Sequence, residues 1–186
     1  MEEGFLVNRG DYHNLISYRK TECIYDITFY FANTYLNKGD RTIDQMIQAA
    51  RSGKQNIAEG SAAAVTSSET ELKLTNVARA SLKELLEDYK DFLRVRELEL
   101  WAPDSAKVQQ TRKVCKEHTD SAYYLEAIKI RSAETIANIA IILLYQADVL
   151  LRKLIESMER RFIATGGIRE QMTQARLEYR KRSKGY

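Results

Sequence analysis

Apolar residues recur at every third or fourth position through most of this chain, a spacing typical of α-helices with one buried face. The chain has one proline and eight glycines in 186 residues, too few for the many turns of an all-β protein. Pro103 is placed to start a short helix over 104–118. The pattern predicts four long helices, over residues 16–36, 41–63, 68–99 and 132–164.

Four long helices with one short insertion predict an all-α fold, an up-and-down four-helix bundle over residues 1–165. Asp40 is placed to cap the second helix, and Ser67 or Ser68 to cap the third. Gly166 and Gly167 would end the last one. Residues 166–186 then form a basic C-terminal extension, either a short amphipathic helix over 168–182 or a tail that becomes ordered on binding.

The second helix carries a seam of mostly small residues on one face. A glycine inside a helix costs about 1 kcal/mol relative to alanine. We therefore expect a neighbouring backbone to approach this seam closely, which would offset that cost. The seam consists of Met46, Ala50, Gly53, Ile57, Gly60 and Ala64.

The first half of the last long helix, residues 136–151, is apolar nearly all round. Either the core surrounds it or a second subunit covers its outer face. The run is interrupted by polar residues and is shorter than the roughly 20 residues that span a bilayer, so we expect no membrane contact. The interrupting residues are Asn138, Gln146 and Asp148.

Cys23 and Cys115 are isolated from each other and from any histidine motif, which favours buried thiols in a reducing compartment. The first residues, MEEGFLVN, contain no apolar signal-peptide segment. We therefore expect a cytoplasmic protein.

The sequence gives no sign of an enzyme. A di-iron bundle needs two Glu-x-x-His pairs, and neither His13 nor His118 follows a glutamate at that spacing. No G-x-S-x-G motif occurs, and Gly53-Lys54 lacks the earlier glycine of a phosphate-binding loop. We expect no catalytic residues, no metal and no cofactor.

Polar residues recur in pairs on the inner faces of three predicted helices. They could form one hydrogen-bonded network across the core, either fixing the register of the helices or lining a cleft or an oligomer pore. The pairs are Asn56 with Glu59, Asn76 with Arg79, and Glu134 with Asn138.

Positive charge gathers at the C-terminal end. The net charge of the chain is +3, but residues 152–186 alone have ten Lys/Arg against four Asp/Glu and so carry +6. This asymmetry favours an anionic partner such as nucleic acid, with a solvated helix face as the alternative. Tyr179 and Tyr186 could stack on bases. The candidate nucleic-acid-binding residues are Arg41, Arg51, Lys54, Arg160, Arg161, Arg169, Arg176, Arg180, Lys181, Arg182 and Lys184.

Three stretches resemble a known family: DRTIDQMIQAARSGKQNIAEG at 40–60, TSSETELKLTNVARASLKELLEDYKDFL at 66–93, and GGIREQMTQARL at 166–177. They resemble the bacterial four-helix-bundle proteins associated with 23S ribosomal RNA intervening sequences, in the branch with a four-helix-bundle suffix domain. That family is related to the accessory variability determinant of diversity-generating retroelements. The resemblance implies a ring-shaped homo-oligomer, a pentamer, and for the retroelement relative also nucleic-acid binding and a reverse transcriptase partner.

These observations predict a non-enzymatic, oligomeric accessory factor that binds RNA or DNA through a basic surface. The alternative is a protein-interaction scaffold whose basic tail docks a partner such as a reverse transcriptase, without contacting nucleic acid itself.

Overall fold

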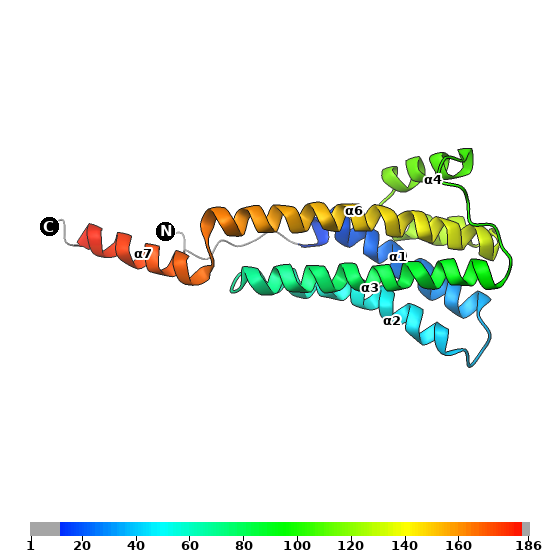
Figure 1. Ribbon diagram of the computed structural model, residues 1–186, viewed down its shortest axis with the longest axis horizontal. Coiled ribbons are helices and arrows are strands. Elements are labelled where there is room, and N and C mark those ends of the chain that lie inside the picture. Colours follow the sequence, from blue (N-terminus) through cyan, green and yellow to red (C-terminus); the bar gives the residue numbers. More distant parts are fainter. Residues whose placement is uncertain (1–11, 184–186) are drawn as a thin grey trace.

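The computed structural model describes residues 12–183, and within that range the protein is all-α (Figure 1). The four long helices predicted from the spacing are confirmed, although the third ends at Val95 rather than at residue 99. The elements are η1 (Tyr12–Asn14), α1 (Ile16–Tyr35), α2 (Arg41–Ala63), α3 (Ser68–Val95), α4 (Ala106–Glu117), α5 (Ser121–Ile128), α6 (Ala133–Thr165) and α7 (Ile168–Ser183).

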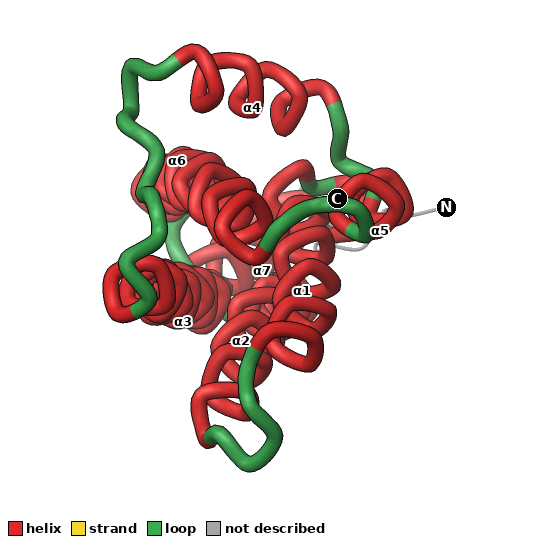
Figure 2. Tube along the Cα trace, turned by 90° about the vertical axis from the view of Figure 1, so that its right-hand side faces the viewer, coloured by secondary structure: helices red, strands yellow, loops and turns green. Residues whose placement is uncertain are grey.

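The long helices share one core. Helices α2 and α6 each pack against both α1 and α3, and Figure 2 shows these four grouped together, with α4 lying outside them. At the centre, the ring of Phe31 lies 5.0 Å from that of Tyr89 and 4.7 Å from that of Phe92, measured between centroids. Met46 of α2 and Leu143 of α6 are fully buried in the same cluster.

Side-chain caps set where the helices begin. The carboxylate of Asp40 accepts a hydrogen bond from the backbone N–H of Thr42, and the hydroxyl of Ser67 accepts one from Thr70, so both predicted caps are confirmed. The prediction for α4 was wrong in detail. That helix starts at Ala106 behind a Ser105 cap, because the serine hydroxyl accepts a hydrogen bond from the free backbone N–H of Val108, and a proline side chain has no acceptor for it. Pro103 lies in the preceding turn.

The small-residue seam of α2 is where α3 approaches it, as expected. Its members are all buried, and a Cβ added at Gly53 would lie only 2.4 Å from Cδ2 of Leu82. A Cβ at Gly60 would lie 3.3 Å from the backbone oxygen of Glu71. The seam therefore sets how closely the two helices pack.

Most of the apolar half of α6 is covered by this chain itself, although Tyr145 is 50% exposed and Val149 is 40% exposed. Every residue from 136 to 144 is buried, and α1, α3 and α4 all contact this helix. Of the two alternatives, the core rather than a second subunit surrounds these positions. By length and composition alone the stretch Ala133–Ser183 contains a window that could cross a membrane, but 61% of that window is buried inside the protein, as in the core helix of a soluble protein.

The chain between α3 and α6 contains a helix that the sequence pattern did not predict. Helix α5 packs on α1, and α4 packs on α6. At eight residues, α5 is too short to show a clear helical period. Asp120 caps it by accepting a hydrogen bond from Ala122.

Helix α7 continues the chain beyond the helical body, on the side where α6 ends (Figure 1). Gly166 ends α6 with a φ of +67°, a conformation that side-chain-bearing residues rarely adopt. None of the residues of α7 is buried. Of the two alternatives predicted for residues 168–182, the structure therefore has a helix, and it leaves that helix exposed.

Candidate nucleic-acid interface

Helix α7 carries two different stripes along its length. An apolar stripe has the three- and four-residue spacing of one helix face, and an arginine stripe with seven- and four-residue spacing lies next to it. A cavity of about 460 Å³ is lined by residues of both stripes, Met172, Ala175, Arg176, Tyr179 and Arg180. The full stripes are Ile168, Met172, Ala175 and Tyr179, and Arg169, Arg176 and Arg180.

The positive charges of α7 are not neutralised by neighbours. Five Lys/Arg and two glutamates leave the helix at +3, and no ion pair among residues 12–183 uses any of its basic side chains. One of the two glutamates, Glu170, turns back to accept a 2.6 Å hydrogen bond from the N–H of Gly167. Arg180, Lys181 and Arg182 occupy the last turn, where the helix dipole favours cations. The positive charge of α7 is therefore available to an anionic partner.

The end of α6 contributes less than the sequence predicted. Arg160 is exposed, but the guanidinium of Arg161 lies 2.5 Å from a carboxylate oxygen of Glu71, whose side chain is only 8% exposed. This ion pair holds the end of α6 against the start of α3. Arg161 is therefore a structural residue, because its charge is already used inside the protein.

The basic residues of α2 do not join the surface of α7. Gly60 contacts Glu71 near the end of the molecule where α6 stops, and Arg41 lies nineteen residues earlier. That separation is about 28 Å along the helix. Arg51 is exposed, while the ammonium of Lys54 lies over the ring of Tyr25, 4.6 Å from its centroid. The structure therefore does not bring all the candidate basic residues together on one surface, and Lys184, with Tyr186, lies outside the described residues.

The predicted polar network across the core was also wrong. The amide of Asn56 donates to the backbone and hydroxyl oxygens of Ser52, and the amide of Asn76 donates to the backbone oxygen of Leu72. All three bonds stay within one helix because an amide at position i reaches the residue at i−4. Asn76 and Glu59 are exposed.

The remaining members of the predicted network, Arg79, Glu134 and Asn138, serve separate contacts. Arg79 forms an ion pair with Asp148, with 2.6 Å between Nε and Oδ1, which links α3 to α6 on a half-exposed surface. Hydrogen bonding to the carboxylate raises the pKa of this arginine.

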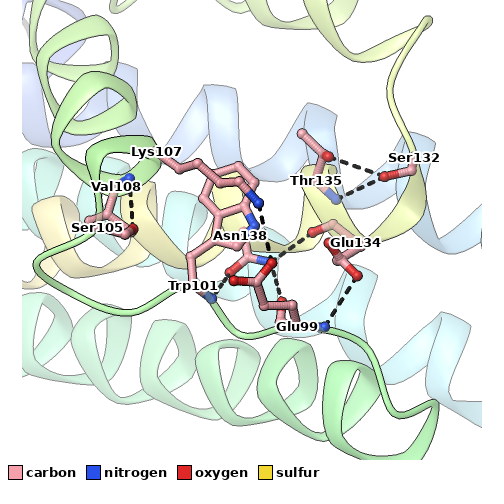
Figure 3. Close-up of polar contacts among 9 residues, drawn as sticks. All are labelled: Glu99, Trp101, Ser105, Lys107, Val108, Ser132, Glu134, Thr135 and Asn138. Atoms are coloured by element: carbon pink, nitrogen blue, oxygen red, sulfur yellow. Dashed lines mark hydrogen bonds and ion pairs between the residues drawn. The ribbon is translucent and has the colours of Figure 1, made fainter.

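Asn138, which is buried, fastens the loop after α3 to α6 (Figure 3). Its amide donates to the backbone oxygens of Glu99, at 2.8 Å, and Glu134, at 2.9 Å, and its oxygen accepts from the N–H of Trp101. The carboxylate of Glu134 accepts from the N–H of Glu99. Asn138 and Glu134 therefore hold this loop against α6 and do not form part of a network across the core.

Sequence reasoning missed a buried lysine. Lys20 is only 2% exposed, and its ammonium donates a 2.9 Å hydrogen bond to the backbone oxygen of His118, at the end of α4. The hydroxyl of Tyr124 donates to the same oxygen. The position of Lys20 beside Cys23 and Ile24, inside the apolar stripe of α1, was the sequence signal that could have indicated its burial.

Burial governs the titration of this cluster. Desolvation lowers the pKa of Lys20 and raises that of Cys23 to about 12. Cys23 and Cys115 are both fully buried, as predicted. The amine anchors the connection between α4 and α5 to α1.

No group of three or more His, Cys, Asp or Glu side chains in the part of the chain that the structure describes could hold a metal ion. The candidate site is the exposed α7 surface, with its unpaired arginines beside an apolar stripe. No protein-family model, curated protein or solved structure matches the chain.

Proposed function

We propose that this chain is a non-enzymatic helical-bundle protein that binds RNA or DNA through α7. In this proposal α1, α2, α3 and α6 form an up-and-down four-helix bundle, and α7 belongs to a basic extension over residues 166–186. The observation that carries the proposal is the row of three unpaired arginines, Arg169, Arg176 and Arg180, on one face of a projecting helix.

The chemistry of this row suits phosphates. Arginine keeps its charge at any physiological pH and presents a planar fork of donors that matches the oxygens of a phosphate. Helix α7 has sixteen residues, so it is about 24 Å long and could lie along several successive phosphates. Because it projects from the body, a nucleic acid could reach it without meeting the other helices.

Binding measured by fluorescence anisotropy over a series of salt concentrations tests the proposal. Each phosphate contact contributes about 0.7–0.9 to the slope of log affinity against log salt. The triple variant Arg169→Gln/Arg176→Gln/Arg180→Gln should therefore lose affinity and about 2–3 units of slope.

The matched control removes three exposed charges from the body, as Arg41→Gln/Arg51→Gln/Lys83→Gln. It loses the same total charge and should retain most of the affinity. Equal losses in the two triple variants would show that only net charge matters. No binding at low salt would remove the proposal altogether.

The scaffold alternative has its own support, since an apolar stripe bordered by arginines also fits an acidic amphipathic helix. A pull-down from nuclease-treated lysate separates the two. A protein partner that is retained after nuclease treatment and is lost in the α7 triple variant would favour the scaffold.

The resemblance to the 23S ribosomal RNA intervening-sequence proteins supports a further part of the proposal, assembly into a homo-oligomer such as a pentamer. Light scattering at micromolar concentration tests this directly. A monomer would contradict it.

A further inference from the structure

We infer that α7 recognises single-stranded nucleic acid, with its arginines on the phosphates and Tyr179 stacked on a base. The inference rests on the proposed function and adds the form of nucleic acid that the helix selects. The observation behind it is that the apolar stripe and the arginine stripe of α7 lie side by side. A surface that bound phosphates alone would need only the arginines.

The spacing of the two stripes fits a strand with exposed bases. Arg176 and Arg180 lie one turn apart, which separates them by about 6 Å along the helix axis, comparable with neighbouring phosphates on an extended single strand. Tyr179 projects beside them from the next row and lines the same cavity. A strand whose phosphates contact the arginines would place its bases over the apolar stripe.

The exposure of the apolar stripe favours a partner that covers it. Tyr179 is 72% exposed and Met172 is 45% exposed, although both are large apolar side chains. Bases in a duplex are stacked on one another inside the helix and offer no face to these residues, whereas unpaired bases do. Stacking between bases and aromatic rings tolerates any sequence, because every base has a π-face.

Other occupants of the stripe fit less well. A second copy of α7 would bring arginine rows together with only two glutamates per helix to balance them. A bilayer surface needs one continuous apolar face, whereas the exposed Leu177 lies on the opposite side of α7 from Met172 and Tyr179.

The test compares full-length protein binding to a labelled single-stranded RNA of about 12 nucleotides, long enough for the 24 Å helix, and to a blunt duplex of the same sequence. The single strand should bind more tightly. Tyr179→Ala should weaken single-strand binding by about 5- to 150-fold and leave duplex binding and the salt slope unchanged. Tyr179→Phe, which keeps the ring, should retain the wild-type affinity.

The outcomes separate this inference from the proposed function. If the arginine variants weaken binding but Tyr179→Ala does not, or if duplex binds as tightly as single strand, the inference fails and the proposed function stands. If neither form of RNA binds, and neither form of DNA of the same sequence binds, the proposed function itself fails. Binding of phosphatidylserine vesicles or of an acidic peptide in place of RNA, when it depends on Tyr179, would also overturn the inference. Because none of the residues of α7 is buried, thermal unfolding should be the same in all variants.

Discussion

Replacing Gly53 by alanine tests the close contact between α2 and α3. A Cβ at this position would lie 2.4 Å from Cδ2 and 2.7 Å from Cγ of Leu82, where carbon atoms in contact prefer about 3.5–4.0 Å. Leu82 would have to retreat by about 1 Å or more. It is only 3% exposed, so it would have to move into packed neighbours.

Two opposing effects set the magnitude. Alanine gains about 1 kcal/mol over glycine in a helix interior. Overpacking a core costs about 1–3 kcal/mol. Gly53→Ala should therefore lower the free energy of unfolding by up to about 2 kcal/mol. At Gly60 the same methyl group would lie 3.3 Å from the backbone oxygen of Glu71, a contact that needs only a small adjustment. Gly60→Ala should therefore be more stable than Gly53→Ala, by about 1–2 kcal/mol.

Urea unfolding followed by circular dichroism measures both variants, and a double-mutant cycle with Leu82→Ala identifies the cause. Leu82→Ala should itself cost about 2–5 kcal/mol. In that background the clash is gone, so Gly53→Ala should become stabilising. A Gly53→Ala effect of the same size and sign in both backgrounds would refute this account of the seam.

Three further outcomes follow from the buried polar groups. Asn138→Ala should lower the free energy of unfolding by about 1–3 kcal/mol, because it leaves backbone groups of the loop unpaired. The control Asn76→Ala removes an exposed amide and should change the free energy of unfolding little. Urea titration measures both variants. Because the pKa of Lys20 is lowered by burial, the unfolded chain binds more protons at this amine between that value and the usual lysine pKa, so the contribution of Lys20 to stability should rise with pH across this interval, while the raised pKa of Cys23 acts in the opposite direction. In urea titrations at several alkaline pH values, the unfolding free energy of the wild type minus that of Lys20→Met should therefore increase with pH, and a constant difference would contradict the buried amine. Iodoacetamide at about pH 8 should modify neither Cys23 nor Cys115 until urea unfolds the protein, and mass spectrometry showing a modified thiol in folded protein would count against their burial.

The helical parts of the fold could be read from the sequence because their signals are local. The spacing of Met46, Gly53 and Ile57 on α2 depends only on the 3.6-residue period, and the caps at Asp40 and Ser67 depend on residues two or three positions away. Each of these predictions is confirmed. Helix α5 was missed because eight residues give the period little room to repeat.

The polar contacts could not be read in the same way, because their partners lie far away in the sequence. Asn138 bonds to Glu99, and Arg161 bonds to Glu71, and no spacing rule connects either pair. A list of basic residues likewise gives no distances, which is why Arg41 was grouped with residues at the other end of the molecule. The arginine stripe of α7 could have been predicted from the sequence, since Arg176 and Arg180 are four residues apart on one helix.

Because α7 follows directly after the bend at Gly166, a small rotation at that bend moves the far end of the helix by a large distance. Tyr179 lies eleven residues beyond the first residue of α7, about 17 Å along the helix. A change of about 30° in the direction of the helix at this one joint would swing that ring through about 9 Å, more than one turn of α7. A side chain at residue 166 would be strained at the present φ of +67°. The direction in which the arginines point thus depends on the backbone conformation at this one glycine.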